Sequence, residues 1–127
     1  MERDQKAYEE FIERNKKRTK EFALRTIRLY QNLPRNEVAR IIGRQLLRSA
    51  TSVGANYRAA CRARTNKEFV AKLRIVCEES DESQYWMELV IDAGLMPAKR
   101  VQELYKESTE LTALFTKAHD TARKKFK

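Results

Sequence analysis

The sequence is poor in glycine, proline, cysteine and histidine, and it has no long apolar run. Its 127 residues hold three glycines, two prolines, two cysteines and one histidine. Because a β-sheet protein needs frequent turns, which use glycine and proline, this scarcity favours long helices. No run of about 18 apolar residues exists, which excludes a transmembrane helix. The first residues also lack an apolar signal core, so we expect a cytoplasmic protein.

The residues that commonly carry chemistry are few and isolated. The single histidine, His119, has no glutamate or histidine at the spacing of a helical metal site. The three glycines are too far apart to form a phosphate-binding loop. Cys61 and Cys77 have no base beside them, and a helical hairpin would separate them by about three turns, too far for a disulfide. We therefore expect reduced thiols, no cofactor, no metal and no enzymatic activity.

The hydrophobic pattern predicts an all-α domain of four helices. Apolar residues recur at steps of three and four, which is typical of amphipathic helices. Residues 15–127 are expected to form the bundle, while residues 1–14 form an N-terminal extension that either lengthens the first helix or frays. The expected helices cover about residues 16–33, 36–63, 66–93 and 97–124. The core side of the second helix is marked by Val38, Ile42, Leu46, Val53, Tyr57 and Ala60.

Several residues mark the expected helix ends. Asn36 is a suitable N-cap for the second helix. Thr65 and Glu68 have the spacing of a capping box at the start of the third helix. Gly94 suits the end of that helix, and Pro97 suits the first position of the fourth. The second and third helices then form an antiparallel hairpin. The third carries small polar residues at its centre, where a large neighbouring side chain or a buried polar contact fits.

The second helix is expected to pack on more than one face. A glycine inside a helix costs about 1 kcal/mol relative to alanine, so close approach of another helix is the expected reason for Gly43 and Gly54. Together with Ala50 they form a strip of small residues beside the core face. We expect the core face to pack within the subunit and the small strip to pack against a second copy. The alternative is the central helix of a monomeric bundle.

The hairpin register brings an arginine close to two acids. In an antiparallel pair, Arg48 lies level with residue 80 of the third helix, so Glu79 and Glu82 are the nearest carboxylates. Such a pair would specify register more than it adds stability. Trp86 adjoins the same acidic face, where it either packs at an interface or stacks on a base. We expect these four residues to serve helix or subunit packing.

The net charge of +9 is confined to one half of the chain. Residues 1–64 hold sixteen basic and seven acidic side chains, whereas residues 65–127 hold eleven of each. Two interpretations stay open: pairing of the basic half with the acids of the third helix, within or between subunits, or attraction of nucleic acid. The candidate nucleic-acid contacts are Lys16, Lys17, Arg18 and Lys20 in the first helix, and Arg40, Arg44, Arg58 and Arg62 in the second.

Residues 45–56, QLLRSATSVGAN, resemble the signature of a family of bacterial four-helix-bundle proteins. Some members are encoded in intervening sequences of the large-subunit ribosomal RNA gene. The resemblance covers about residues 15–118, including FALR at 22–25 and ESQYWMEL at 82–89. One departure is Ala59, at a position where the family usually has a glutamate, so a contact made by that acid is in doubt.

This resemblance implies an antiparallel up-down-up-down bundle that assembles as a ring, a homopentamer, without enzymatic activity. Distant relatives are the basic accessory proteins of diversity-generating retroelements, which implies a reverse transcriptase-like partner as a more remote option. The leading interpretation is therefore a non-enzymatic, oligomeric bundle that binds RNA or DNA through its basic surface. The alternative is a structural or protein-interaction module whose arginines serve subunit contacts.

Overall fold

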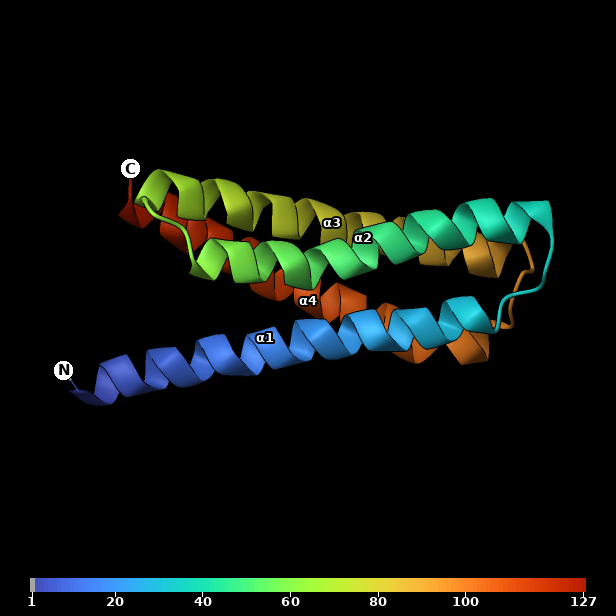
Figure 1. The fold of residues 1–127 in the computed structure, drawn as a ribbon, viewed down its shortest axis with the longest axis horizontal. Coiled ribbons are helices and arrows are strands. Elements are labelled where there is room, and N and C mark those ends of the chain that lie inside the picture. The colour runs from blue at the N-terminus through green and yellow to red at the C-terminus, as the bar shows by residue number, and fades with distance from the viewer. Residues whose placement is uncertain (1) are drawn as a thin grey trace.

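A computed structural model describes residues 2–127 and arranges them in four helices. Successive helices run in opposite directions, so the two ends of the chain lie at the same end of the bundle (Figure 1). The fold is an antiparallel up-down-up-down four-helix bundle, which confirms the predicted fold class. The helices are α1 (Glu2–Gln31), α2 (Glu37–Cys61), α3 (Asn66–Asp92) and α4 (Ala98–Lys125).

The predicted N-caps of α2 and α3 form as expected. The Asn36 side chain accepts a hydrogen bond from the backbone N–H of Ala39 at 2.9 Å. The Thr65 hydroxyl accepts one from the N–H of Glu68 at 3.0 Å. In a capping box the Glu68 carboxylate would accept a hydrogen bond from the N–H of Thr65. Here it accepts instead from the N–H of Arg64, one residue earlier, at 3.3 Å. These bonds satisfy donors that have no partner inside the helix.

The turn between α3 and α4 differs from expectation by one residue. Gly94 follows the last turn of α3 and has a φ of 70°, the left-handed conformation that glycine adopts without strain. Pro97 was expected at the first helical position of α4. It instead precedes the helix with an extended backbone, φ −60° and ψ 139°, and α4 begins at Ala98. Proline fixes φ but leaves ψ free, so it suits either position.

Helix α1 begins at Glu2 rather than near Lys16, so the N-terminal extension lengthens the first helix. Residues 2–15 contain neither glycine nor proline that would interrupt a helix. Phe11 and Ile12 are half-buried and continue the inward-facing stripe that leads to the buried Asn15 and Phe22. Tyr8 lies one turn earlier and is 52% exposed. The extension therefore belongs to the bundle for part of its length.

The core lies between the four helices and follows the predicted stripes, with one exception. Val38 was expected inside but is 53% exposed, whereas its neighbour Ala39 is 1% exposed. Val38 stands in the first turn of α2, at the end of the bundle and at the edge of the apolar stripe, where no neighbouring helix covers it. The largest fully buried side chains include Phe22, Leu46, Val53, Leu73, Val76, Met87, Val90, Val101, Leu111 and Phe115.

The centre of the core is polar, as the sequence of α3 suggested. The hydroxyl of Ser83 donates to that of Ser49 on α2 at 3.0 Å. The hydroxyls of Ser80 and Thr112 on α4 lie 2.7 Å apart. Both serines of α3 are fully buried. Buried polar groups need such partners because an unpaired one costs stability. The prediction of a small or polar centre is thus met by hydroxyl contacts to both neighbouring helices.

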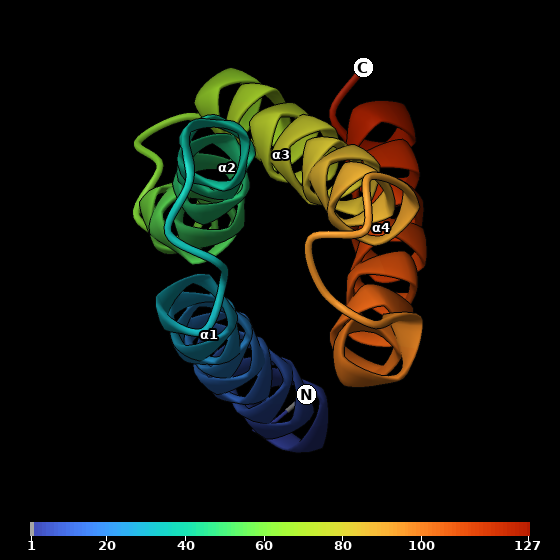
Figure 2. The ribbon, with the colours of Figure 1, turned by 90° about the vertical axis from the view of Figure 1, so that its right-hand side faces the viewer.

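Helix α1 packs mainly against α2 and makes few contacts with α4. Figure 2, a view along the bundle, shows α1 nearer to α2 than to α4. A bidentate ion pair joins the two sparsely packed helices. Arg18 of α1 donates to both carboxylate oxygens of Glu107 on α4, at 2.7 and 2.8 Å. The side of the bundle between α1 and α4 is therefore its least tightly packed side.

Candidate nucleic-acid interface

A basic groove runs between α1 and α2. Its volume is about 900 Å³. Among the described residues that line it, Glu13 is the single acid, so the lining carries a surplus of four positive charges. We call this feature the α1–α2 basic groove. Its five cationic side chains are Arg14, Lys16, Lys17 and Lys20 on α1 and Arg58 on α2.

Small residues allow the two helices to form this groove. Thr51, Gly54 and Ala55 line it from α2, and Thr19 lines it from α1. A Cβ at Gly54 would lie 3.2 Å from the Thr19 hydroxyl oxygen, so the backbones approach closely. Arg40, Arg44, Arg48, Arg58 and the C-cap residue Arg62 form an arginine row along one side of α2, and Thr51 and Ala55 occupy its middle. Their short side chains leave space on the α2 side of the groove.

The structure brings together four of the predicted nucleic-acid contacts. Lys17, Lys20 and Arg58 line the α1–α2 basic groove, and all are exposed. Within residues 2–127 they form no ion pair with a carboxylate. Lys16 also lines the groove and forms a loose pair with Glu13 at 3.5 Å. The lysine cluster of α1 and one arginine of α2 therefore share one surface, although they are far apart in sequence.

Arg18 was expected to contact nucleic acid, but its guanidinium is committed to α4. It forms the bidentate pair with Glu107 and lies 3.5 Å from Glu110. The hydrogen bond to Glu107 raises the pKa of Arg18. A bidentate pair of this kind uses the donors that a phosphate would need. Arg18 is therefore reassigned to the contact between α1 and α4.

The remaining arginine candidates, Arg40 and Arg44 on α2 and Arg62 at its C-cap, lie outside the groove. Arg40 pairs with Glu37, one turn earlier, at 3.0 Å. Arg44 and Arg62 are exposed, and neither pairs with a carboxylate in the described part of the chain. The arginine row of α2 therefore divides into members with different neighbours and does not form one continuous basic face.

The strip of small residues on α2 packs against α1 of the same chain. A Cβ at Gly43 would lie 2.8 Å from the Tyr30 ring and 2.9 Å from the Leu33 side chain. Gly54 meets Thr19 of α1, as described above. Ala50 is fully buried in the core. The expected close approach is thus made by α1 of the same chain, and a contact of this strip with a second copy stays a prediction.

Arg48 bridges α2 and α3 at the expected register. Its guanidinium lies 3.1 Å from Glu79 and 2.5 Å from Glu82. The indole N–H of Trp86 donates to the same Glu82 carboxylate at 3.0 Å. Trp86 is half-buried against the core, and its neighbour Tyr85 is 53% exposed. This cluster joins the two helices on the outer face of the hairpin.

The two carboxylates of this cluster differ in their electrostatic surroundings. Burial raises the pKa of Glu79, although Arg48 opposes the shift. The hydrogen bond from Trp86 lowers the pKa of Glu82, and Arg48 adds to that effect. The hydrogen bond to Glu82 raises the pKa of Arg48. Glu82 is therefore the more readily ionised of the two, because Trp86 stabilises its charged form while burial disfavours that of Glu79.

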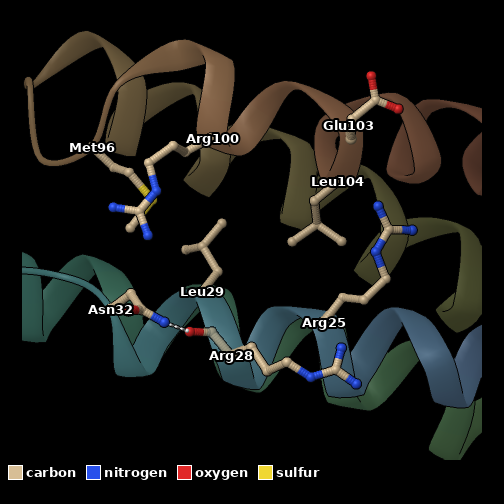
Figure 3. A pocket seen from close by; sticks show the side chains of 8 residues that line it. All are labelled: Arg25, Arg28, Leu29, Asn32, Met96, Arg100, Glu103 and Leu104. Carbon is tan, nitrogen blue, oxygen red and sulfur yellow. Dashed lines mark hydrogen bonds between the residues drawn. The ribbon is translucent and has the colours of Figure 1, made fainter.

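A second basic cleft lies on the other flank of α1, facing α4 (Figure 3). Leu29, Met96 and Leu104 form its apolar floor, and its volume is about 270 Å³. Arg25 of α1 and Arg100 of α4 extend over this floor, while the Glu103 carboxylate points away from it (Figure 3).

The sequence analysis missed Arg25 and Arg100, as well as Arg14 of the α1–α2 basic groove. Arg25 and Arg14 lie on the helix face beside the α1 core stripe, a position that predicts the edge of a groove. No sequence pattern indicated that Arg100 would line a cleft, because its contact with α1 depends on how α4 packs against that helix.

Among residues 2–127 no group of three or more histidine, cysteine, aspartate or glutamate side chains is arranged to hold a metal ion. In the same residues no helix combines the length and apolar character needed to cross a membrane. Cys61 and Cys77 are free, half-buried thiols whose pKa values are raised by burial.

The fold and the α1–α2 basic groove together define a basic four-helix-bundle protein. The chain belongs to the 23S rRNA-intervening sequence protein family, whose sequence model matches residues 14–117. It is also similar to the crystal structure of a protein of unknown function from the S23 ribosomal protein family of Bacteroides thetaiotaomicron. That similarity has a TM-score of 0.77 and 33% sequence identity, and it covers 83% of this chain and 94% of the other. No curated protein matches the chain.

Proposed function

We propose that this protein binds nucleic acid, preferentially RNA, and that the α1–α2 basic groove is the contact surface. One observation carries the proposal: the groove gathers Arg14, Lys17, Lys20 and Arg58 without an ion-pair partner within residues 2–127. Neutralising phosphates with such side chains releases counterions, which supplies the free energy of sequence-independent binding. The relationship of the family to ribosomal RNA genes favours RNA over DNA.

The second basic cleft extends this surface to the other flank of α1. Arg25, Arg28 and Arg100 line it, so α1 carries unpaired or weakly paired cations on both sides of its exposed face. Arg28 lies 3.6 Å from Glu21, and both side chains are more than half exposed, so this pair competes weakly with a phosphate. A single RNA segment lying across α1 would contact both clefts.

Binding should be measured by fluorescence anisotropy with a labelled ribosomal RNA fragment over a series of salt concentrations. We expect the logarithm of the affinity to fall linearly with the logarithm of salt concentration. The triple variant Lys17→Glu/Lys20→Glu/Arg58→Glu should bind weakly and should reduce the slope by about 0.7–0.9 for each lost phosphate contact.

The matched control is Lys67→Glu/Lys99→Glu/Lys106→Glu. It changes the net charge by the same amount at exposed positions outside both clefts. We expect it to retain most of the affinity, because the proposal assigns binding to a local surface and not to net charge alone. Equal loss in the two triple variants, or no binding of the wild-type protein at low salt, would contradict the proposal.

The alternative function, a homo-oligomeric or protein-interaction module, is favoured by exposed apolar side chains. Val38 and Ile41 on α2 are 53% and 54% exposed, and Tyr85 on α3 is 53% exposed. Contacts between the subunits of a ring would cover such side chains, and we propose that this ring is a pentamer. Light scattering would give the molar mass, and Ile41→Glu should reduce it if this face is a subunit contact.

Alanine variants of Arg44, Arg48 and Arg58 distinguish the two functions. Loss of the assembly favours the interaction module, and loss of RNA affinity by an intact assembly favours nucleic-acid binding.

A further inference from the structure

An apolar groove lies at the end of the bundle that holds both termini. It has a volume of about 460 Å³, within the range of small-molecule sites in proteins. Side chains from all four helices line it, including Phe11 of α1, Tyr57 of α2, Phe69 of α3 and Leu114 of α4. A groove of predominantly apolar lining therefore contacts every helix at this end of the bundle.

The charge of the groove has one sign. Lys117 and Lys125 of α4 line it, and no acidic residue does so among residues 2–127. Neither lysine forms an ion pair with a carboxylate in that part of the chain, and the Lys125 ammonium lies 5.4 Å from the ring of Phe126. An apolar groove with two unpaired cations at its edge is complementary to an anion that carries an apolar tail.

About half of the residues that line the groove lie outside the family match, which spans residues 14–117. Tyr8, Phe11 and Ile12 precede that range, and the α4 side continues beyond it as far as Phe126. The groove is separate from the α1–α2 basic groove, whose lining lies inside the matched range apart from Glu13.

We propose that this groove binds a free fatty acid of medium chain length as a monomer. The carboxylate pairs with Lys125, and the alkyl chain lies along Ala122, Ala118 and Leu114. Lys117, about 12 Å further along α4, adds positive charge at the edge of the groove. From Lys125 to Leu114 the α4 side extends for about 16 Å at 1.5 Å per residue, which is comparable with an extended dodecanoate. The lysines remain at the solvent edge, so the carboxylate is neutralised without being deeply buried.

The first test uses the wild-type protein and its own thiols. Cys61 lines the groove, whereas Cys77 does not, and both are half-buried with pKa values raised by burial. Dodecanoate below its micelle concentration should slow alkylation of Cys61 by about tenfold at saturation and leave Cys77 unchanged. Dodecyltrimethylammonium, with the same tail and the opposite charge, should protect Cys61 much less. Hexadecanoate should bind no more tightly than dodecanoate, because its four extra carbons extend beyond the apolar lining of about 16 Å along α4.

The second test changes the cations. Lys117→Glu/Lys125→Glu should weaken dodecanoate binding by about tenfold or more, since two attractions become repulsions. Lys106→Glu/Lys124→Glu makes the same charge change at exposed α4 positions that do not line the groove, and should preserve the affinity within about twofold. Circular dichroism melting curves identify any variant that fails to fold, and the thiol measurement on the wild-type chain is independent of the variants.

Three results would overturn the proposal. The first is absence of Cys61 protection by dodecanoate, and the second is equal protection by the cationic analogue. The third is protection of Cys61 that rises with protein concentration when no fatty acid is present, which would assign the groove to a second copy of the chain. None of these outcomes depends on whether the α1–α2 basic groove binds RNA.

Discussion

At the scale of single residues, Glu79 and Glu82 have different roles although both face Arg48. Glu82 accepts hydrogen bonds from Arg48 and Trp86, and its pKa is lowered. Glu79 is more buried, and its pKa is raised because burial outweighs the attraction of Arg48. Arg48 therefore faces one carboxylate, Glu82, whose surroundings favour the ionised form, and another, Glu79, whose burial disfavours it.

These opposite shifts predict opposite effects on acid stability. A lowered pKa contributes stability above the unfolded value of about 4.5 and loses it as pH falls through the folded value. A raised pKa contributes stability at low pH and loses it as pH rises through the folded value. Glu82→Gln should therefore flatten the loss of stability below about pH 5, and Glu79→Gln should steepen it, each by a few tenths of a kcal/mol because the cluster is partly solvated.

Urea unfolding of both variants and the wild type across a series of acidic to neutral buffers would measure these slopes. Glu88→Gln is a matched control, since its carboxylate accepts from the Tyr105 hydroxyl and does not contact Arg48. Identical acid slopes for Glu79→Gln and Glu82→Gln would show that the cluster does not distinguish its two carboxylates.

At the scale of elements, the contact between α1 and α2 depends on the two glycines of α2 to different degrees. A methyl group at Gly43 would approach Tyr30 and Leu33 to 2.9 Å or less, a distance that real Cβ contacts do not show. At Gly54 the nearest atom would be the Thr19 hydroxyl oxygen at 3.2 Å, a tight but tolerable contact. Gly43 is therefore the position at which an added methyl group would clash with the side chains that pack against α2.

Replacing each glycine by alanine should separate these cases. Gly43→Ala should destabilise the protein by about 1–3 kcal/mol, since overpacking displaces the end of α1. Gly54→Ala should lie within about 1 kcal/mol of wild type, because the gain in helix propensity offsets the tight contact with Thr19. Thermal or urea unfolding gives both values. A larger loss at Gly54 than at Gly43 would contradict the packing described here.

At the scale of the whole molecule, the bundle is unevenly packed around its axis. Helix α1 contacts α2 extensively and α4 sparsely, and Arg18 with Glu107 is the bidentate pair that spans the sparse side. The Glu107 side chain is 16% exposed. Removing its partner would leave a poorly solvated carboxylate between the two helices.

Arg18→Ala should therefore cost about 1–3 kcal/mol of unfolding free energy, most of it from the unpaired carboxylate. Amide hydrogen exchange should accelerate in α1 more than in the hairpin of α2 and α3. Arg74→Ala removes an exposed ion pair within α3 and is the control, with an expected cost below about 0.5 kcal/mol. Equal costs for the two variants would mean that the Arg18 pair behaves as an ordinary surface pair.

Much of the architecture was predictable because it depends on local signals. The apolar spacing predicted four helices, the side chains of Asn36 and Thr65 predicted two helix starts, and the register of the hairpin predicted the contact of Arg48 with Glu79 and Glu82. Each of these depends on residues in one helix or in two helices joined by a short turn. Where the signal was weak, as at residues 2–15, the sequence left both a helical extension and a frayed end open, and the structure shows the extension.

The candidate sites were less predictable, since they depend on which helix lies beside which. Helical periodicity placed Gly43 and Gly54 on a close-contact face, yet it could not say that α1 of the same chain would occupy that face. Adjacency in sequence grouped Arg18 with Lys17 and Lys20. Successive helical residues point about 100° apart, so Arg18 contacts Glu107 on α4 while the two lysines line the groove beside α2.

The sequence by itself determined the helices, their ends and the polar centre of the core, because propensity, capping and apolar spacing act over a few residues. Only the tertiary structure decided which cations are neutralised, which flank of α2 is covered by α1, and where grooves remain. The physical reason is that charge pairing and groove shape arise from distances between side chains that are remote in sequence.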